Sequence, residues 1–215
     1  RRGGKKLRTV SGSQVVLTPE EQRKYDYFFL EASRLKTQKE YGAAFDMLKH
    51  CLNINPDASS ALYEISQYYL FLKQVPQGLA ALEKAVKNEP DNYWYSQGLA
   101  SLYQQQNETQ KAVDLLEGMS VRFSGKLDPL YSLLDIYNDQ EDYQKVITTL
   151  NRLEEKTGKN EQLSMEKFRI YLQMKDNRSA FHEIESLVEE YPLDMRYQVV
   201  LGDVYMQNGK KEEAY

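Results

Sequence analysis

Apolar and small residues repeat along this chain with a period of 34 residues. Large apolar residues form one series without insertion or deletion, at Leu35, Tyr69, Tyr103, Tyr137, Tyr171 and Tyr205. Small residues, with one valine among them, form a second series nine positions further on, at Ala44, Gly78, Ala112, Val146, Ala180 and Ala214. Self-similarity at this period predicts a stacked array of two-helix units.

Two further series mark the inside and the end of each unit. A branched apolar residue recurs at Leu48, Leu82, Leu116, Leu150 and Ile184, and most units close with a turn former, at Pro56, Pro90, Ser124, Gly158 and Pro192. We predict a first helix that begins at Pro19 behind a capping box of Thr18 and Glu21. The first helix of the fourth unit is expected to start late, with Asp128 as its cap. The other predicted helices include residues 41–53, 59–72, 75–88, 93–105, 109–123 and 143–156.

These residues resemble tetratricopeptide repeats, which carry a large residue, a small residue, a leucine or isoleucine and a proline at the same places. The resemblance covers residues 25–215 and implies an all-α, right-handed superhelical solenoid of antiparallel helix pairs. The units would be residues 25–58, 59–92, 93–126, 127–160 and 161–194, followed by a truncated sixth, 195–215. The solenoid would span residues 19–215 as part of a longer protein, and residues 1–18 would form a basic, flexible N-terminal arm or linker.

The fifth unit is the least regular. Ser164 and Lys167 stand at positions where several other units carry large apolar residues, and Phe168 stands where a small residue is usual. We expect stability to be lowest in this unit, because polar groups at an interhelix contact weaken it.

Net charge narrows the choice of partners. The chain has 215 residues and a formal net charge of −4, and its first eighteen residues carry five positive charges and no acid, which leaves −9 for the repeats. That sign opposes nucleic-acid binding. No apolar run is long enough to span a membrane. The frequent tyrosine and glutamine residues resemble bacterial repeat proteins of the Bacteroidetes, some of which are exported, so both a cytoplasmic and an exported, periplasmic location stay open.

Motifs for catalysis, cofactors and metal ions are absent from the sequence. The two histidines are His50 and His182, and the residues after His182 break the spacing of a metalloprotease motif. There is no glycine-rich phosphate loop, and one cysteine with two histidines is too few for a zinc cluster. The cysteine, Cys51, falls in the apolar pattern and is expected to be a small buried residue. We predict a protein that is not an enzyme and uses no cofactor.

The resemblance implies a concave groove lined by positions 2, 5, 9, 12 and 13 of each unit. Aromatic rings run through these positions in the first four units, interleaved with neutral polar side chains, and charged residues follow. The candidate groove residues are Phe29, Tyr63, Gln67, Phe71, Trp94, Gln97, Ser101, Tyr131, Asp135 and Arg169. Rings and amides suit an extended peptide. The alternative is that Tyr63 and Tyr131 only cover seams between helices, and that Asp135 pairs with Arg169.

The predicted function is that of a non-catalytic scaffold whose groove binds a protein or peptide. Self-association through the groove or an open end of the array is the alternative. Repeats that clamp the C-terminal carboxylate of cytosolic chaperones use lysine, arginine and asparagine at defined positions of three units. The first three units here have Phe29, Ser33, Glu64, Trp94 and Gly98 instead, so that carboxylate clamp is absent.

Overall fold

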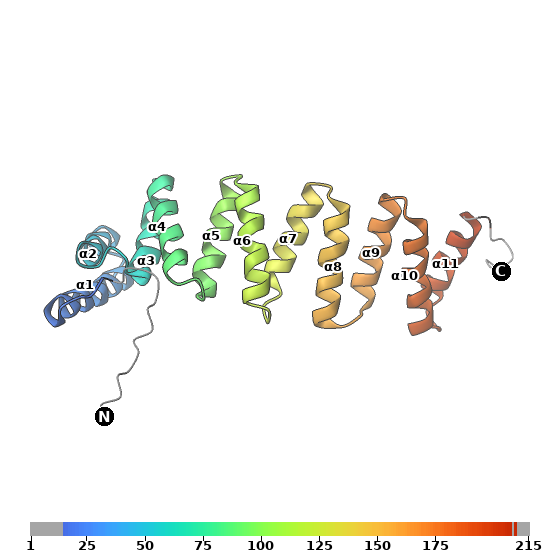
Figure 1. The fold of residues 1–215 in the computed structure, drawn as a ribbon, viewed down its shortest axis with the longest axis horizontal. Coiled ribbons are helices and arrows are strands. Elements are labelled where there is room, and N and C mark those ends of the chain that lie inside the picture. The colour runs from blue at the N-terminus through green and yellow to red at the C-terminus, as the bar shows by residue number, and fades with distance from the viewer. Residues whose placement is uncertain (1–14, 208, 210–215) are drawn as a thin grey trace, which may run out of the picture. The chain divides into compact units, whose positions relative to one another are not determined.

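The chain is helical throughout the part that the structure describes. The computed structural model describes residues 15–207 and Gly209, so most of the predicted basic arm and the predicted last helix lie outside the described residues. Within that range there are eleven α-helices and no strands, which confirms the all-α prediction (Figure 1). They are α1 (Pro19–Thr37), α2 (Tyr41–Ile54), α3 (Ser59–Phe71), α4 (Val75–Asn88), α5 (Tyr93–Gln105), α6 (Thr109–Arg122), α7 (Asp128–Asp139), α8 (Tyr143–Thr157), α9 (Glu161–Gln173), α10 (Asn177–Glu190) and α11 (Met195–Gln207).

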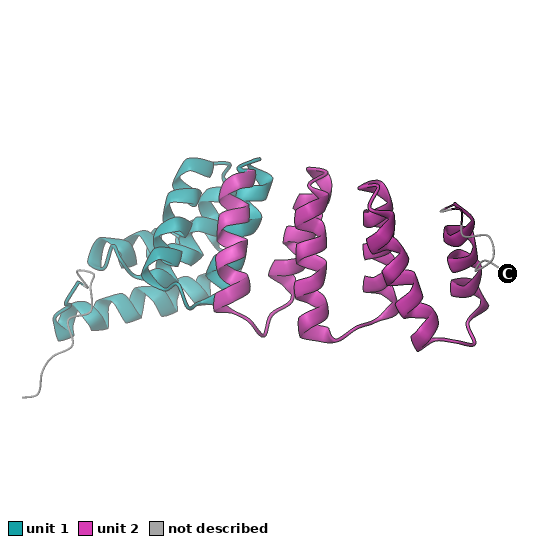
Figure 2. Ribbon diagram, turned by 45° about the vertical axis from the view of Figure 1, so that its right-hand side comes forward, with its two compact units in different colours: residues 1–108 teal, residues 109–215 magenta. Residues whose placement is uncertain are grey.

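The helices form two compact units (Figure 2). Unit 1 is Arg1–Glu108, with helices α1 to α5, and unit 2 is Thr109–Tyr215, with helices α6 to α11. The division falls between the two helices of the predicted third repeat. Inside each unit, helices that follow one another along the chain pack side by side, as in the pairs α1/α2, α3/α4, α7/α8 and α9/α10.

The short turns that follow the first helix of each repeat share one backbone conformation. One residue in each adopts a positive φ between 54° and 76°, and these residues recur every 34 positions, at Lys39, Lys73, Asn107, Glu141, Lys175 and Gly209. The left-handed conformation costs an L-residue roughly 1–2 kcal/mol, and glycine adopts it readily. Five of these six turns therefore carry a local strain that packing of the adjoining helices must offset.

The observed start of α1 agrees with the prediction from the sequence, and the observed cap of α7 differs from it. The Thr18 hydroxyl accepts from the Glu21 backbone N–H at 3.2 Å, and the Glu21 carboxylate accepts from the Thr18 N–H at 2.8 Å, which confirms the capping box. The prediction that Asp128 caps α7 was wrong. The N-cap is Leu127, because its carbonyl accepts the first helical bonds, from Leu130 at 2.9 Å and Tyr131 at 3.2 Å. Asp128 lies in the first turn instead, where its charge suits the helix dipole.

The series of small residues marks close approaches between helices. Its members Ala44, Ala112, Val146 and Ala180 have no exposed surface. At Gly78 an added Cβ would lie 2.8 Å from Leu70 Cδ2 and 3.2 Å from the Ser66 carbonyl oxygen. Helix α4 can therefore lie this close to α3 only because Gly78 has no side chain.

Three tyrosines of the large apolar series each form the same type of hydrogen bond. Their hydroxyls donate to a glutamate twenty residues earlier in the chain, and the pairs are Tyr103–Glu83 at 2.7 Å, Tyr137–Glu117 at 2.9 Å and Tyr205–Glu185 at 3.2 Å. Burial, reinforced by the Glu117 carboxylate, raises the pKa of Tyr137 to about 12. These tyrosines thus fill the seams with their rings and satisfy their hydroxyls at the edge.

Unit 2 contains a buried charge at the place where the fifth repeat is irregular. The Lys167 side chain is only 5% exposed, and its ammonium lies 2.7 Å from the Glu154 carboxylate and 2.9 Å from that of Glu183. Burial disfavours the ammonium, but the bonds to both glutamates outweigh it and raise the pKa of Lys167. One side chain of α9 is thereby tied to α8 and to α10.

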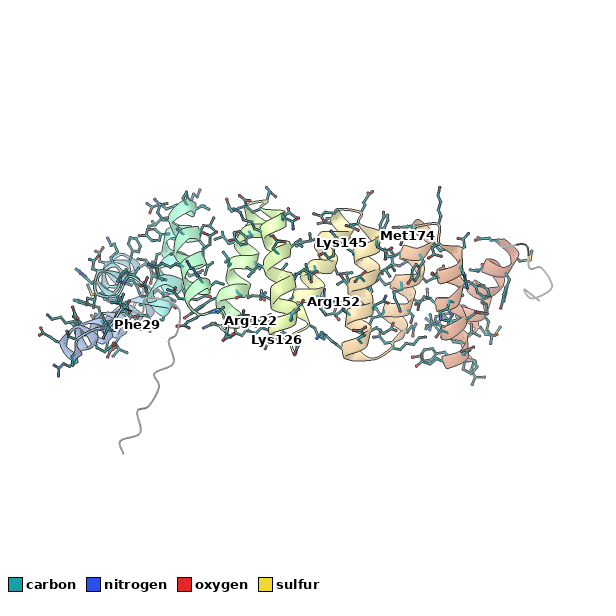
Figure 3. The ribbon with its side chains drawn as sticks, in the orientation of Figure 1. Phe29, Arg122, Lys126, Lys145, Arg152 and Met174 are labelled. Carbon is teal, nitrogen blue, oxygen red and sulfur yellow. The ribbon has the colours of Figure 1, made fainter. Side chains whose placement is uncertain are left out.

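A second polar cluster in unit 2 ties α8 to α6. The Arg152 guanidinium donates to the Glu117 carboxylate at 2.8 Å and also to the Ser120 hydroxyl. Lys145, on the same helix, lies over the Tyr137 ring at 5.3 Å. Figure 3 labels Lys145 and Arg152 along α8. Two of the seams in unit 2 therefore close around charged groups.

The cysteine is an inert part of the unit 1 core, as predicted. Cys51 is fully buried, its thiol points at the Tyr25 carbonyl oxygen at 3.8 Å, and burial raises its pKa to about 11. A thiol with a pKa this high is protonated at neutral pH and is a weak nucleophile.

Candidate peptide-binding surface

Two aromatic rings of unit 1 are exposed at positions where the other units have polar residues. Phe71, the last residue of α3, is 82% exposed, and Trp94, in the first turn of α5, is 66% exposed. The residues that occupy the position of Phe71 in the other units are all polar, namely Thr37, Gln105, Asp139, Gln173 and Gln207. The same holds for the position of Trp94, with Asp26, Ser60, Asp128, Gln162 and Arg196. Neither ring is therefore required by the repeat as such.

Phe71 forms one wall of a hollow on unit 1, which we call the α1–α3 hollow. It has a volume of about 310 Å³ and is lined by Lys36 of α1, Tyr41 of α2, and Gln67, Tyr68 and Phe71 of α3. Three of these five side chains are aromatic. The Tyr68 ring is itself held against Phe45 of α2, with centroids 5.9 Å apart, so this wall rests on the core.

The charge at the rim of the α1–α3 hollow is already neutralised. The Lys36 ammonium lies 2.8 Å from the Glu64 carboxylate. That hydrogen bond raises the pKa of Lys36 in spite of partial burial, and burial raises the pKa of Tyr68. Lysine and tyrosine therefore keep their protons at neutral pH, and the lining offers ring faces with a paired charge at its edge.

Two predicted groove rings are partly covered by other side chains. Tyr63 is half-buried and stacks on Tyr95 of α5 with centroids 4.8 Å apart. Phe29, labelled on α1 in Figure 3, is half-buried and lies parallel to Tyr25 at 6.0 Å. Both pack against the core of unit 1. Their outer edges border the surface, but much of each ring fills a seam.

The predicted polar residues of unit 1 lie on the helices that carry the exposed rings. Gln67 is exposed and donates to the Ser66 hydroxyl at 3.1 Å, while Gln97 and Ser101 are half-buried on α5. The Tyr63–Tyr95 stack fixes the spacing of the exposed rings. Phe71 is eight residues beyond Tyr63 on α3, and Trp94 directly precedes Tyr95, so the two exposed rings are roughly 12 Å or more apart along the helix direction.

The candidate residues of unit 2 are exposed and lie on two helices. Tyr131 and Asp135 belong to α7, and Arg169 belongs to α9. Arg169 forms an ion pair with Glu166 of its own helix. Its charge is therefore balanced locally, and the arrangement gives Asp135 no role in holding it.

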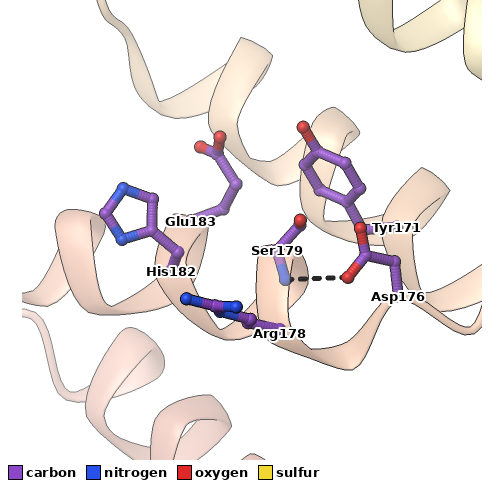
Figure 4. Close-up of a pocket in the computed structure, with 6 residues that line it drawn as sticks. All are labelled: Tyr171, Asp176, Arg178, Ser179, His182 and Glu183. Atoms are coloured by element: carbon purple, nitrogen blue, oxygen red, sulfur yellow. Dashed lines mark hydrogen bonds between the residues drawn. The ribbon is translucent and has the colours of Figure 1, made fainter.

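A polar hollow of about 510 Å³ lies on unit 2 and is lined by Tyr171, Asp176, Arg178, Ser179, His182 and Glu183 (Figure 4). Both of its carboxylates have structural roles. Asp176 accepts from the Ser179 N–H at 3.1 Å as the cap of α10, and Glu183 holds Lys167.

Within residues 15–207 and Gly209, no three His, Cys, Asp or Glu side chains are grouped to hold a metal ion. None of the described helices is long and apolar enough to cross a membrane.

The sequence did not reveal Tyr41 and Tyr68 as part of a surface. Tyr68 occupies a position where the four following units have buried aliphatic residues, Leu102, Ile136, Ile170 and Val204. That difference is visible in the sequence, but it does not by itself show that the Tyr68 ring reaches the surface. Tyr41 starts α2 and reaches the hollow only because α1, α2 and α3 meet there.

The fold and this surface define the chain as an all-helical repeat protein. Residues 165–215 match the family model described as tetratricopeptide repeat. No curated protein matches the chain. The family match in that segment and the similar solved structures agree with the resemblance seen in the sequence: residues 165–215 match a tetratricopeptide repeat, and the chain has the fold of tetratricopeptide repeat proteins.

Several solved structures share the fold. A tetratricopeptide repeat protein from Parabacteroides merdae is 16% identical, with a TM-score of 0.59 over 89% of this chain and 76% of that chain. MamA from Desulfovibrio magneticus is 15% identical, with a TM-score of 0.54 over 80% and 97%. The structure of Naa15/Naa10 bound to HypK is 18% identical, with a TM-score of 0.63 over 91% of this chain and 31% of that chain. At these identities the similarity shows the fold alone. Tetratricopeptide folds generally mediate protein–protein interactions and are generally non-catalytic.

Proposed function

We propose that unit 1 binds a segment of another polypeptide, and that Phe71 and Trp94 are its principal contacts. The observation that carries the proposal is Phe71, an exposed ring at a position where every other unit has a polar residue. Exposing a large ring gives the folded chain no stability, whereas covering it with a partner removes apolar surface from water. Tryptophan is also enriched among residues that dominate binding energy.

The surroundings of the two rings suit a peptide. Gln67, Gln97 and Ser101 offer amide and hydroxyl groups that can pair with a peptide backbone. A spacing of roughly 12 Å between the rings requires at least about four extended residues to bridge them. Phe29 and Tyr63 would contribute their outer edges, and Tyr131, Asp135 and Arg169 are candidates for contacts by unit 2.

The comparisons support binding as the class of function. The structure of Naa15/Naa10 bound to HypK is a complex that contains a chain of similar fold. A scaffold role without catalysis agrees with the general behaviour of these repeats. The partner proposed for this chain is a peptide or protein of unassigned identity.

Selection from a random peptide display library would test the proposal. We expect enrichment of peptides whose affinity falls roughly 30-fold when Trp94→Gln or Phe71→Gln is introduced, equivalent to a loss of about 2 kcal/mol. Tyr27→Gln is the matched control, because Tyr27 is a similarly exposed ring on α1 outside the proposed surface. Selected peptides that bind both variants as well as the parent chain would overturn the proposal, as would a selection that enriches none.

Self-association is a second candidate, supported by the loop before α11. Leu193 is 94% exposed and Met195 is also exposed. The position of Leu193 is filled by Asp57, Asp91, Gly125 and Lys159 in the preceding units. Light-scattering mass should fall on dilution if the chain associates through this loop, and Leu193→Asp should abolish the dependence. A constant monomer mass would exclude this candidate.

A further inference from the structure

The α1–α3 hollow differs from an ordinary seam between repeats. In the later units the residue equivalent to Tyr68 is aliphatic and buried, so nothing at that place reaches the surface. Here the longer side chain is half-buried and its ring stands beside Phe71 and Tyr41 in the lining. Three aromatic residues from two helices thus create a concave surface that the repeat architecture alone does not supply.

The size and lining of the hollow restrict what fits inside. Its volume of about 310 Å³ lies at the lower limit of about 300 Å³ for small-molecule sites, which suits one side chain better than an entire cofactor. The lining is mainly aromatic, and burial of an unpaired charge against it would be costly. The Lys36 ammonium is engaged with Glu64, so an anionic occupant would have to displace that carboxylate to pair with the ammonium.

The rim offers polar groups to the backbone of an occupant. Gln67 uses its amide N–H to bond Ser66, and its carbonyl oxygen can accept an N–H from a bound peptide. The Tyr41 side chain is exposed and has a hydroxyl that can donate to a peptide carbonyl. A peptide can therefore lie across the rim with one side chain directed inwards, the arrangement by which pockets give specificity to a bound segment.

We infer that the α1–α3 hollow is an anchor pocket that takes one large, uncharged apolar side chain, such as Leu, Met or Phe, from the polypeptide bound by unit 1. The inference rests on the proposed function and makes it more specific. Trp94 contacts a different part of the same segment. Affinity for a peptide then depends on one apolar residue far more than on its neighbours.

Single-residue probes test the pocket without any known partner. N-acetyl-phenylalaninamide and N-acetyl-leucinamide should bind with millimolar dissociation constants, and N-acetyl-aspartamide should not bind. Amide shifts in a two-dimensional NMR spectrum of the whole chain should centre on Lys36, Tyr41 and Tyr68. Gln67→Phe should fill the hollow and weaken probe binding more than tenfold. Gln77→Phe, the same change at an exposed glutamine of α4 outside the hollow and the groove positions, should leave it unchanged.

The outcomes separate this inference from the proposed function. Probe shifts that disappear in Gln67→Phe and persist in Gln77→Phe support the pocket, even if peptide selection enriches nothing. Selected peptides that lose affinity in Trp94→Gln but bind Gln67→Phe normally support peptide binding and overturn the pocket. Probe shifts that are absent, or that are equal in both glutamine variants, overturn it as well.

Discussion

The two units differ in the charge that they bury between repeats. In unit 1, rings meet across the seams, with Tyr63 stacked on Tyr95 and Phe45 edge-on to Tyr69 at 5.3 Å. In unit 2, the helices around α8 and α9 are tied by Lys167 with its two glutamates and by Arg152 with Glu117. One array therefore shows both solutions to the same packing problem.

The two solutions tolerate change differently. A ring contact is worth about 0.5–1.5 kcal/mol beyond its buried area, and part of it survives a small shift. A buried ion pair is favourable only when complete, because removing one partner leaves an uncompensated charge away from water. Unit 1 can therefore present rings at its surface at little risk to its fold, whereas the charges of unit 2 are committed to holding helices together.

The largest effect is expected at Lys167. Lys167→Ala leaves the Glu154 and Glu183 carboxylates facing each other in a buried seam and should destabilise unit 2 by about 3–5 kcal/mol. Hydrogen exchange should accelerate in α8 to α10 and stay unchanged in α1 to α4.

Two controls separate charge from packing at this seam. Lys167→Met with Glu154→Gln and Glu183→Gln removes all three charges and should restore most of the lost stability. Ser164→Ala on the same helix should be neutral or stabilising, because the Ser164 hydroxyl is buried without a hydrogen-bond partner. Slow exchange in Lys167→Ala would show that the pairs contribute little, and that the low stability predicted for the fifth repeat has another cause.

The next effect concerns the close approach of α3 and α4 in unit 1. Gly78→Ala places a Cβ against Leu70 and the Ser66 carbonyl and should cost about 1–3 kcal/mol through overpacking. Gly118→Ala on α6, where an added Cβ meets open space, should instead stabilise by about 0.5–1 kcal/mol from helix propensity. Denaturant titrations of both variants measure whether each substitution raises or lowers the free energy of unfolding. An equal gain in stability for Gly78→Ala and Gly118→Ala would mean that α4 can move away from α3 at little cost in free energy.

The tyrosine–glutamate bonds should make stability depend on alkaline pH. A tyrosine in the unfolded chain has a pKa near 10, and Tyr137 in the fold has a pKa of about 12. The unfolded state releases its proton first, so the contribution of Tyr137 is complete below pH ~10 and is lost as the pH rises towards ~12. Tyr137→Phe should cost about 1 kcal/mol at neutral pH and flatten the alkaline decline in the free energy of unfolding.

Tyr131→Phe is the control for this effect, because that ring is exposed on the same helix. It should change neither the stability at neutral pH nor the slope of the free energy of unfolding between pH ~10 and ~12. An alkaline decline that is the same in Tyr137→Phe and in the parent chain would assign the pH dependence to other residues.

Local signals were enough to predict the helices but not the seams. The spans 75–88 and 93–105 were predicted with their observed bounds, because Pro76 is tolerated in a first turn and Asn92 caps the following helix. The sequence predicts Lys167 as a weak point because it is a polar residue at a seam position, and it does not show the partners Glu154 and Glu183, which lie on other helices. The exposed rings at Phe71 and Trp94 were found from their repeat positions. The hollow beside Phe71 was not, because it depends on how three helices meet.

The smallest stability effect, and the most informative for function, is expected at the exposed rings. Phe71→Gln installs the residue found at the same position as Gln105, Gln173 and Gln207, and Trp94→Gln matches Gln162. Each should change the free energy of unfolding by no more than about 0.5 kcal/mol, as for surface sites without special roles. Tyr63→Ala, in the Tyr95 stack, should cost more, up to about 3 kcal/mol. Thermal melts of the three variants show, before any partner is known, whether the exposed rings contribute to the stability of unit 1. If Phe71→Gln or Trp94→Gln lowers stability as much as Tyr63→Ala, the substituted ring is part of the packing of unit 1 and is not a binding residue.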